Sequence, residues 1–226
     1  MLRTVSESTN QRPGCNLYVI FARDAPVAAV LRRGPSRWYQ VTKWRTDIDE
    51  FEPGAWIKGH IYEYKCDLSP DGELLSYFCL QGAKLIRGEL ATDSWAAISR
   101  LPWLKAIALW RVGTTYGSAP HFVSSRVVSR MTFSEDGDVP YIPPPAWLGV
   151  VDDKGPPAAR HGRTYSEGSV HWAGTDHGGH TILARDGCLY RVAGGEERLL
   201  HDFRVYTPKP EKAPDWAVEE PPSRSG

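Results

Sequence analysis

Residues 66–78 read CDLSPDGELLSYF, and this stretch decides the fold. The Pro-Asp-Gly sequence at 70–72 favours a tight turn, because proline pre-sets one backbone angle, aspartate tolerates tight conformations and glycine supplies a positive φ. The runs on either side, HIYEYKCDL and ELLSYFCL, are strand-like. The sequence therefore predicts a β-hairpin from Asp67 to Phe78, with a corner at Ser69–Gly72 that is structural rather than functional.

Apolar runs separated by corners also occur elsewhere in the chain. CNLYVIFARDAPVAAVLRRG (15–34) fits two strands of a hairpin better than one helix, because Pro26 interrupts it. WYQVTKWR (38–45) alternates with period two, as a strand with one aromatic face does. GTDHGGHTILARDGCLYRVAGGEERLLHDF (174–203) predicts a three-stranded meander. The expected fold is therefore mainly β, with antiparallel meanders in a β-propeller-like arrangement or an irregular β-sandwich.

The segment DSWAAISRLPWLKAIALWRVG (93–113) is open to two interpretations. The spacing of Trp95, Ile98 and Leu101 suits a helix, whereas Pro102 breaks that register. We predict buried strands here.

The predicted domain organisation is one β-rich domain with irregular ends. Residues 1–14 are polar and predict a disordered lead. Residues 15–206 form the domain, and within it residues 134–170 are a long irregular loop rich in proline and glycine. Residues 207–226 are a Pro-rich charged tail.

Composition and charge argue against several classes of protein. The 226 residues include 27 basic and 27 acidic side chains, whereas proteins that neutralise phosphates normally carry a basic excess. No apolar run approaches the roughly 18 residues of a membrane helix, and the N-terminus lacks the apolar core of a signal peptide. The four cysteines form no Cys-x-x-Cys pair, which argues against a zinc ribbon or a redox pair. We therefore expect a cytoplasmic protein with reduced thiols and no membrane partner.

The corners carry a resemblance to known β proteins. LSPDGELLSYF (68–78) resembles the strand-turn-strand in blades of WD40-like and TolB-like β-propellers. ILARDGCLYRV (182–192) is similar, and IFARDAPVAAV (20–30) is a degenerate third copy. The resemblance implies blade-like antiparallel sheets.

Longer stretches carry a second resemblance. They are VIFARDAPVAAVLRRGPSRW (19–38), GHIYEYKCDLSPDGELLSYF (59–78), the run Ile107–Trp110 and ILARDGCLYRV (182–192). On these, the chain resembles a family of uncharacterised bacterial β-rich proteins over most of residues 16–205. The resemblance implies a stand-alone, soluble, β-rich protein, and it supplies no catalytic motif to transfer.

The segment HWAGTDHGGH (171–180) contains candidate metal ligands. Three imidazoles and one carboxylate, from His171, Asp176, His177 and His180, match the donors of a divalent metal site. However, two of the histidines lie in a glycine-rich corner, and metal ligands gain affinity from rigid positioning. We predict no bound metal and no other cofactor, and keep a metal-dependent hydrolase built on His171–His180 as the alternative function.

The stretch RRGPSRWYQVTKWR (32–45) combines cations with aromatic rings. Such a stretch could track single-stranded nucleic acid by stacking bases on its rings. The competing interpretation places the aromatic face in the core and the cations on the other face. The acidic TDIDEFE (46–52) follows at once and nearly cancels the local charge, so nucleic-acid binding through residues 32–45 is a second alternative.

Aromatic side chains supply the candidate contact surface. The sequence has no motif for nucleophilic catalysis and no phosphate-binding loop, whereas Trp and Tyr dominate interface hot spots. We therefore predict a non-catalytic protein, not an enzyme, that binds another bacterial protein. An accessory subunit of a larger assembly and a toxin-neutralising immunity protein both fit this description. The predicted contact residues, in segments 95–116 and 134–170, are Trp95, Trp103, Trp110, Tyr116, Tyr141 and Trp147.

Overall fold

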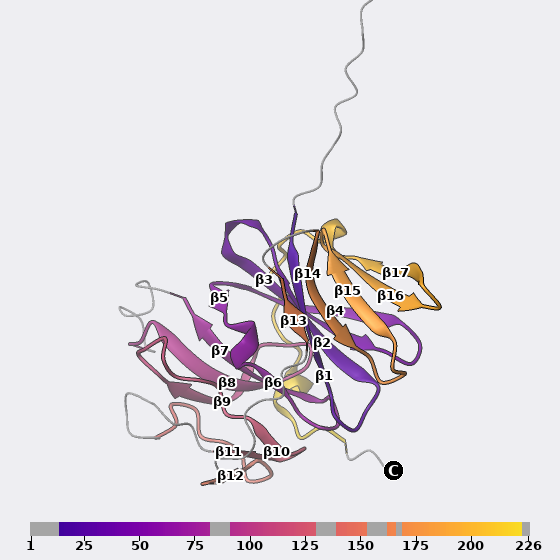
Figure 1. The fold of residues 1–226 in the computed structure, drawn as a ribbon. Coiled ribbons are helices and arrows are strands. Elements are labelled where there is room, and N and C mark those ends of the chain that lie inside the picture. Colours follow the sequence, from indigo (N-terminus) through magenta and orange to yellow (C-terminus); the bar gives the residue numbers. More distant parts are fainter. Residues whose placement is uncertain (1–13, 82–90, 130–138, 153–161, 166–168, 223–226) are drawn as a thin grey trace, which may run out of the picture.

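The protein is mainly β, as predicted, with 50% of residues in strands and 7% in helices. The computed structural model describes residues 14–81, 91–129, 139–152, 162–165 and 169–222. The predicted disordered lead lies outside the described residues, except for Gly14. The described strands form four sheets, most of whose neighbouring strands run antiparallel (Figure 1).

The first sheet is a four-stranded antiparallel meander in chain order. It contains the predicted hairpin around Pro26 and the predicted strand with one aromatic face. Its strands are β1 (Asn16–Phe21), β2 (Val27–Arg33), β3 (Trp38–Arg45) and β4 (Glu50–Lys58), with the short 3-10 helix η1 (Pro35–Arg37) between β2 and β3.

The second sheet is built around the opening stretch. The Ser69 N–H donates to Leu74 O at 2.8 Å, the Gly72 N–H donates to Ser69 O at 2.8 Å, and Gly72 has φ +75°, which confirms the predicted hairpin corner. The ambiguous segment 93–113 forms two strands, as predicted, and Pro102 lies in the connection between them. The elements are β5 (His60–Ile61), the 3-10 helix η2 (Glu63–Lys65), β6 (Asp67–Leu68), β7 (Leu74–Leu80), β8 (Ser94–Arg100) and β9 (Ala106–Arg111).

The third and fourth sheets follow along the chain. The third combines one antiparallel and one parallel strand pair, and the fourth contains the predicted three-stranded meander. The third consists of β10 (Phe122–Ser124), β11 (Val127–Ser129) and β12 (Gly149–Val151). The fourth consists of β13 (Arg163–Thr164), β14 (Val170–Thr175), β15 (Thr181–Arg185), β16 (Cys188–Ala193) and β17 (Glu196–Asp202), followed by the 3-10 helices η3 (Phe203–Val205) and η4 (Asp215–Val218).

The first sheet is covered on both faces. Since strand residues alternate between faces, Leu31 and Val41 pack with the second sheet, whereas Val30 and Trp44 pack with the fourth. The third sheet covers the remaining face of the second through a separate apolar cluster that includes Phe122. The sheets therefore stack in the order fourth, first, second, third, and β1 contacts both β6 and β14 (Figure 1).

The hairpin corner of the second sheet is tied to the third sheet by charge. The Ser69 hydroxyl donates to Asp71 Oδ1 at 2.6 Å, and Arg126 Nη1, in the turn between β10 and β11, donates to Asp71 Oδ2 at 2.7 Å. Beneath the corner, the buried carboxylate of Asp67 accepts from the Phe122 N–H at 2.7 Å. The corner therefore fixes one sheet to the next.

Two irregular regions contain more structure than the sequence indicates. The predicted loop 134–170 includes β12 and β13, and parts of it lie outside the described residues. The tail returns to the body, because Trp216 O accepts a hydrogen bond from Arg100 Nη1 at 3.1 Å and Ala217 is buried. No sheet among the described residues closes into a barrel or a propeller, and none of the described helices has the length and apolar character needed to cross a membrane.

Candidate functional site

Four of the six predicted contact residues are buried or half-buried. Trp95 and Trp110 have exposed fractions of 6% and 4%, and each belongs to an apolar cluster on one face of the second sheet. Trp103 and Trp147 are half-buried. Because the second sheet is covered on both faces, its tryptophans stabilise the interior and present little area to a partner.

The other two predicted residues are exposed, and a third tyrosine accompanies them. Tyr116 is 89% exposed and Tyr141 is 45% exposed, whereas Tyr64, on η2, is 66% exposed. All three lie around the end of the second sheet where β9 ends. Ile142, next to Tyr141, pairs with β9, the loop of Tyr116 follows β9, and Lys65 joins η2 to that loop. We call Tyr64, Tyr116 and Tyr141 the tyrosine surface.

A lysine holds part of the tyrosine surface together. Lys65 Nζ lies 5.2 Å from the ring centroid of Tyr62 and 5.9 Å from that of Tyr64. The same ammonium group donates to Thr115 O, and to Gly117 O at 2.6 Å, on either side of Tyr116. Burial lowers the pKa of Lys65. One cation therefore joins η2 to the loop that follows β9.

Arg111 has a comparable position beside Tyr141. Its guanidinium carbon lies 5.9 Å from the ring centroid of Tyr141, and the Leu109 N–H donates to Ile142 O at 3.0 Å, which attaches the segment of Tyr141 to β9. The tyrosine surface thus combines exposed aromatic rings with an arginine, and both kinds of residue are enriched in protein interfaces.

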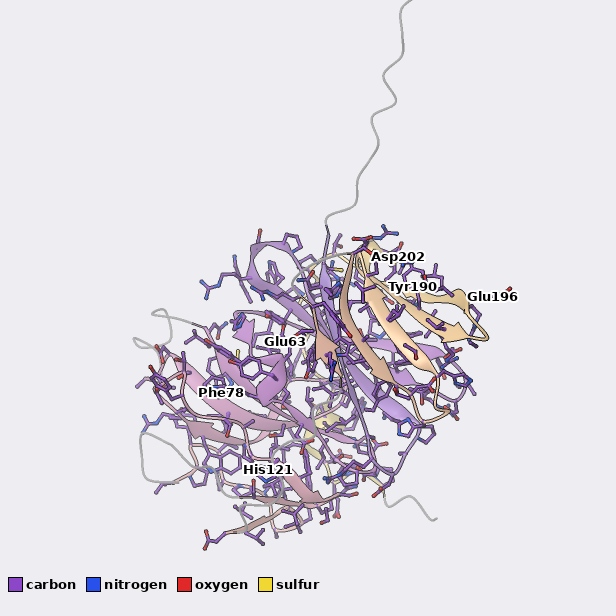
Figure 2. The ribbon with its side chains drawn as sticks, in the orientation of Figure 1. Glu63, Phe78, His121, Tyr190, Glu196 and Asp202 are labelled. Atoms are coloured by element: carbon purple, nitrogen blue, oxygen red, sulfur yellow. The ribbon has the colours of Figure 1, made fainter. Side chains whose placement is uncertain are left out.

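Next to η2 lies a hydrogen-bonded cluster that the sequence analysis missed. The Tyr39 hydroxyl donates to Glu63 Oε1 at 3.0 Å and lies 3.2 Å from His60 Nδ1. Figure 2 shows Glu63 where the second sheet meets the first. Burial raises the pKa of the Glu63 carboxyl and of the Tyr39 hydroxyl. Burial, together with Arg33 and Arg37, lowers the pKa of His60, so the imidazole is neutral at pH 7.

The candidate metal ligands His171 and His177 have structural partners. His171 Nε2 accepts a hydrogen bond from the Leu17 N–H at 2.6 Å. His177 Nε2 lies 2.7 Å from Ala22 O, and the ring packs edge-on against Phe21. Both imidazoles therefore join the fourth sheet to β1 and the residues that follow it.

Asp176 and His180 also serve the fold. Asp176 Oδ1 accepts from the backbone N–H groups of Gly178 and His180 at 2.9 Å each, and Asp176 Oδ2 accepts from Arg191 Nε at 2.9 Å. The carboxylate thus closes the turn between β14 and β15. Among the described residues, no group of three or more His, Cys, Asp or Glu side chains is placed to hold a metal ion.

Three of the five cations in the basic stretch 32–45 have partners within the fold. Arg32 is buried, and its Nε donates to Phe203 O at 2.9 Å. Lys43 Nζ lies 3.3 Å from a carboxylate oxygen of Glu73. Arg45 lies 3.6 Å from carboxylate oxygens of both Asp47 and Glu50. These three cations are therefore not free to track a phosphate backbone.

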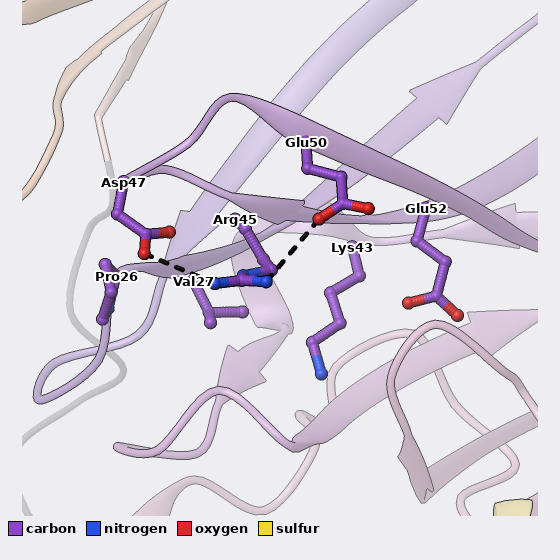
Figure 3. A pocket seen from close by; sticks show the side chains of 7 residues that line it. All are labelled: Pro26, Val27, Lys43, Arg45, Asp47, Glu50 and Glu52. Atoms are coloured by element: carbon purple, nitrogen blue, oxygen red, sulfur yellow. Dashed lines mark ion pairs between the residues drawn. The ribbon is translucent and has the colours of Figure 1, made fainter.

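Two of these cations line a pocket of about 440 Å³ beside the β3–β4 hairpin (Figure 3). Arg45 lies between its two carboxylate partners, and Lys43 stands opposite Glu52 in the strand register. Cations and carboxylates thus alternate along the pocket, and its lining shows no set of like groups that converge on one ligand. Its lining residues are Pro26, Val27, Lys43, Arg45, Asp47, Glu50 and Glu52.

Comparison of the chain with protein-family models, with curated proteins and with solved structures gave no match.

Proposed function

We propose that this chain is a non-catalytic protein that binds another bacterial protein through the tyrosine surface. The observation that carries the proposal is the exposure of Tyr64, Tyr116 and Tyr141, at 66%, 89% and 45%, around one end of the second sheet. Tyrosine buries a large rigid area on binding, and tyrosine and arginine are enriched among the residues that dominate interface energies.

The scaffold supports this role because it holds the backbone of the loop that carries Tyr116. Lys65 bonds to the carbonyl groups on both sides of Tyr116, and the Tyr116 N–H donates to Thr114 Oγ1 at 3.2 Å. A loop ordered before binding loses less conformational entropy when the partner arrives. A specific complex of this kind buries more than about 1,000 Å² in total.

The proposed partner classes are those that the sequence favours. An accessory subunit and a toxin-neutralising immunity protein both act by occupying a partner, and both are compatible with a surface of rings and cations. The proposed location is the cytoplasm, and the four buried, unpaired cysteines agree with it.

The finer architecture also belongs to this proposal. We propose that the four sheets are related to β-propeller blades, with an irregular β-sandwich as the other option. Three of the sheets are antiparallel, neighbouring sheets pack face to face, and β1 contacts both β6 and β14, as inner strands of neighbouring blades do.

The test of the proposal is the effect of Tyr116→Ala on a co-purified complex. Because Tyr116 is 89% exposed, its removal should leave the fold intact and weaken partner binding about 30-fold, the effect of losing a hot spot. Hydrogen exchange should show protection on binding confined to residues 62–65, 113–117 and 139–142.

The matched control is Leu199→Ala on β17. Leu199 is 52% exposed but lies on the fourth sheet, so its variant should bind within about twofold of wild type. Protection centred on residues 32–45 and abolished by moderate salt would instead favour the nucleic-acid alternative.

A further inference from the structure

Two arginines lie close enough to His60 at the end of the first sheet to affect its charge. Arg33 stands directly opposite Tyr39 in the β2–β3 register, so its side chain shares the face on which Tyr39 meets His60. Arg37 O accepts a hydrogen bond from the Gly59 N–H at 2.9 Å, which places Arg37 beside the residue preceding His60. Both arginine side chains are exposed, and neither forms an ion pair with any described residue.

The hydrogen bonds of His60 leave one ring nitrogen available. The Tyr39 hydroxyl donates a hydrogen bond to Glu63, so the hydroxyl oxygen of Tyr39 accepts a hydrogen bond from the N–H group at His60 Nδ1. Nε2 is then the nitrogen without a partner among the described residues. Glu63, Tyr39 and His60 therefore form a chain that fixes the ring and leaves Nε2 free to contact a ligand.

The loop that carries Arg37 is held in a costly conformation. Ser36 and Arg37 have φ values of 60° and 62°, in the left-handed region that costs a residue with a side chain roughly 1–2 kcal/mol. Glycine would remove this cost at either position, yet neither position has it. Such outliers persist where the surrounding structure imposes them and they occur preferentially at ligand sites.

We propose that Arg33, Arg37 and His60 form a binding site for the phosphate group of a small molecule. Guanidinium groups bind phosphate oxygens through paired N–H donors, and protonated His60 adds an N–H donor at Nε2. The charge of a phosphate dianion offsets the two arginines, whereas a carboxylate offsets only one. The site is separate from the tyrosine surface and stands without the proposed partner.

Phosphate binding is linked to the protonation of His60. The groups that face the ring are Arg33 from β2, Arg37 from η1, Tyr39 from β3, and Tyr62 and Glu63 from the segment after β5. In the free protein, burial and the two cations keep the ring neutral. A bound dianion offsets the two cations and so favours the imidazolium, whose added proton comes from solvent.

The test follows the imidazole resonances of the full chain by NMR during titration with inorganic phosphate at constant ionic strength. Saturable shifts of the His60 signals are expected, assigned with His60→Gln, and the titration midpoint of His60 should rise by about one pH unit with phosphate bound. Arg33→Gln and Arg37→Gln should each weaken phosphate binding about tenfold. Arg163→Gln, at an exposed arginine on β13, should leave binding unchanged.

A second variant separates binding from folding. Arg37→Gly relieves the left-handed conformation, so it should raise the urea midpoint of unfolding while it weakens phosphate binding as Arg37→Gln does. The proposal is wrong if phosphate produces no saturable shift, or if acetate binds as well as phosphate. It is also wrong if Arg163→Gln weakens binding as much as Arg37→Gln.

Discussion

Gly72 shows how much of this fold depends on one backbone conformation. Its φ of +75° is one that side chains disfavour, and a Cβ atom there would lie 2.6 Å from Val27 Cβ. The hairpin corner of the second sheet thus approaches the first sheet more closely than any residue with a side chain allows. Glycine is required here both for its conformation and for its size.

Gly72→Ala should therefore destabilise the protein more than the same change at another left-handed glycine. Gly194 has φ +60° with no atom within 4 Å of its Cβ position, so Gly194→Ala should cost only the conformational penalty, about 1 kcal/mol. Gly72→Ala adds a steric overlap and should cost about 2–4 kcal/mol. Urea unfolding of both variants measures the difference, and equal losses would show that the close approach has no energetic weight.

At the scale of elements, the hairpin corners could be predicted from the sequence, but the division of the runs between them into strands and turns could not. Pro-Asp-Gly and Arg-Asp-Gly corners have local causes, so the sequence located the hairpins. The run HIYEYKCDL looked like one strand, yet it forms β5, then η2, then β6. The 3-10 turn exposes Tyr64 and brings Glu63 to Tyr39, and both effects depend on the distant β3 and β7. This is why the tyrosine surface was only partly predicted and the His60 cluster was not.

The ion pair between Asp71 and Arg126 should couple the second sheet to the third. The side chains are only 16% and 21% exposed and lie 2.7 Å apart, so a double-mutant cycle with Asp71→Asn and Arg126→Ala should give a coupling of about 1–2 kcal/mol. Asparagine keeps an oxygen that can accept from the Ser69 hydroxyl, which confines the change to the charge.

The pair Arg45–Glu50 is the control for that cycle. Its charged groups are 3.6 Å apart and 50% and 63% exposed, so its coupling should stay below about 0.5 kcal/mol. Similar couplings in the two cycles would contradict a special role for the corner in joining the sheets.

At the scale of the molecule, the stacking of sheets decides which aromatics are available. Trp95 and Trp110 lie on opposite faces of the second sheet, and both are buried because the first and third sheets cover those faces. Period-two alternation separates two faces but does not say whether either meets solvent. Whether a strand face meets solvent depends on contacts between distant segments, so the sequence alone does not show which tryptophans are exposed.

Stability of the whole molecule should fall on mild acidification. Burial lowers the pKa of His60, His171 and His201 below the ordinary 6.5. The unfolded chain then binds more protons than the native state as the pH falls through 6.5, so the stabilisation present above that pH is lost. Glu63, whose pKa is raised by burial, acts in the opposite direction but is a single group.

The measurement is the free energy of unfolding in urea at pH 7.5 and pH 5.5, for wild type and His171→Gln. Glutamine has an oxygen that can accept from the Leu17 N–H but does not titrate. The wild type should be less stable at pH 5.5, and the variant should lose less between the two pH values. An identical loss in both proteins would exclude His171 as a contributor.

The covering of the first sheet on both faces has a consequence for synthesis of the protein on the ribosome. β1 to β4 are translated first, but the sheet that covers one of their faces ends at Asp202. At 5–20 residues per second, the roughly 140 intervening residues take about 7–30 s to translate. During that time an apolar face that includes Val30 and Trp44 has no intramolecular cover. We therefore expect the nascent chain to expose the kind of apolar surface that chaperones shield until the fourth sheet emerges.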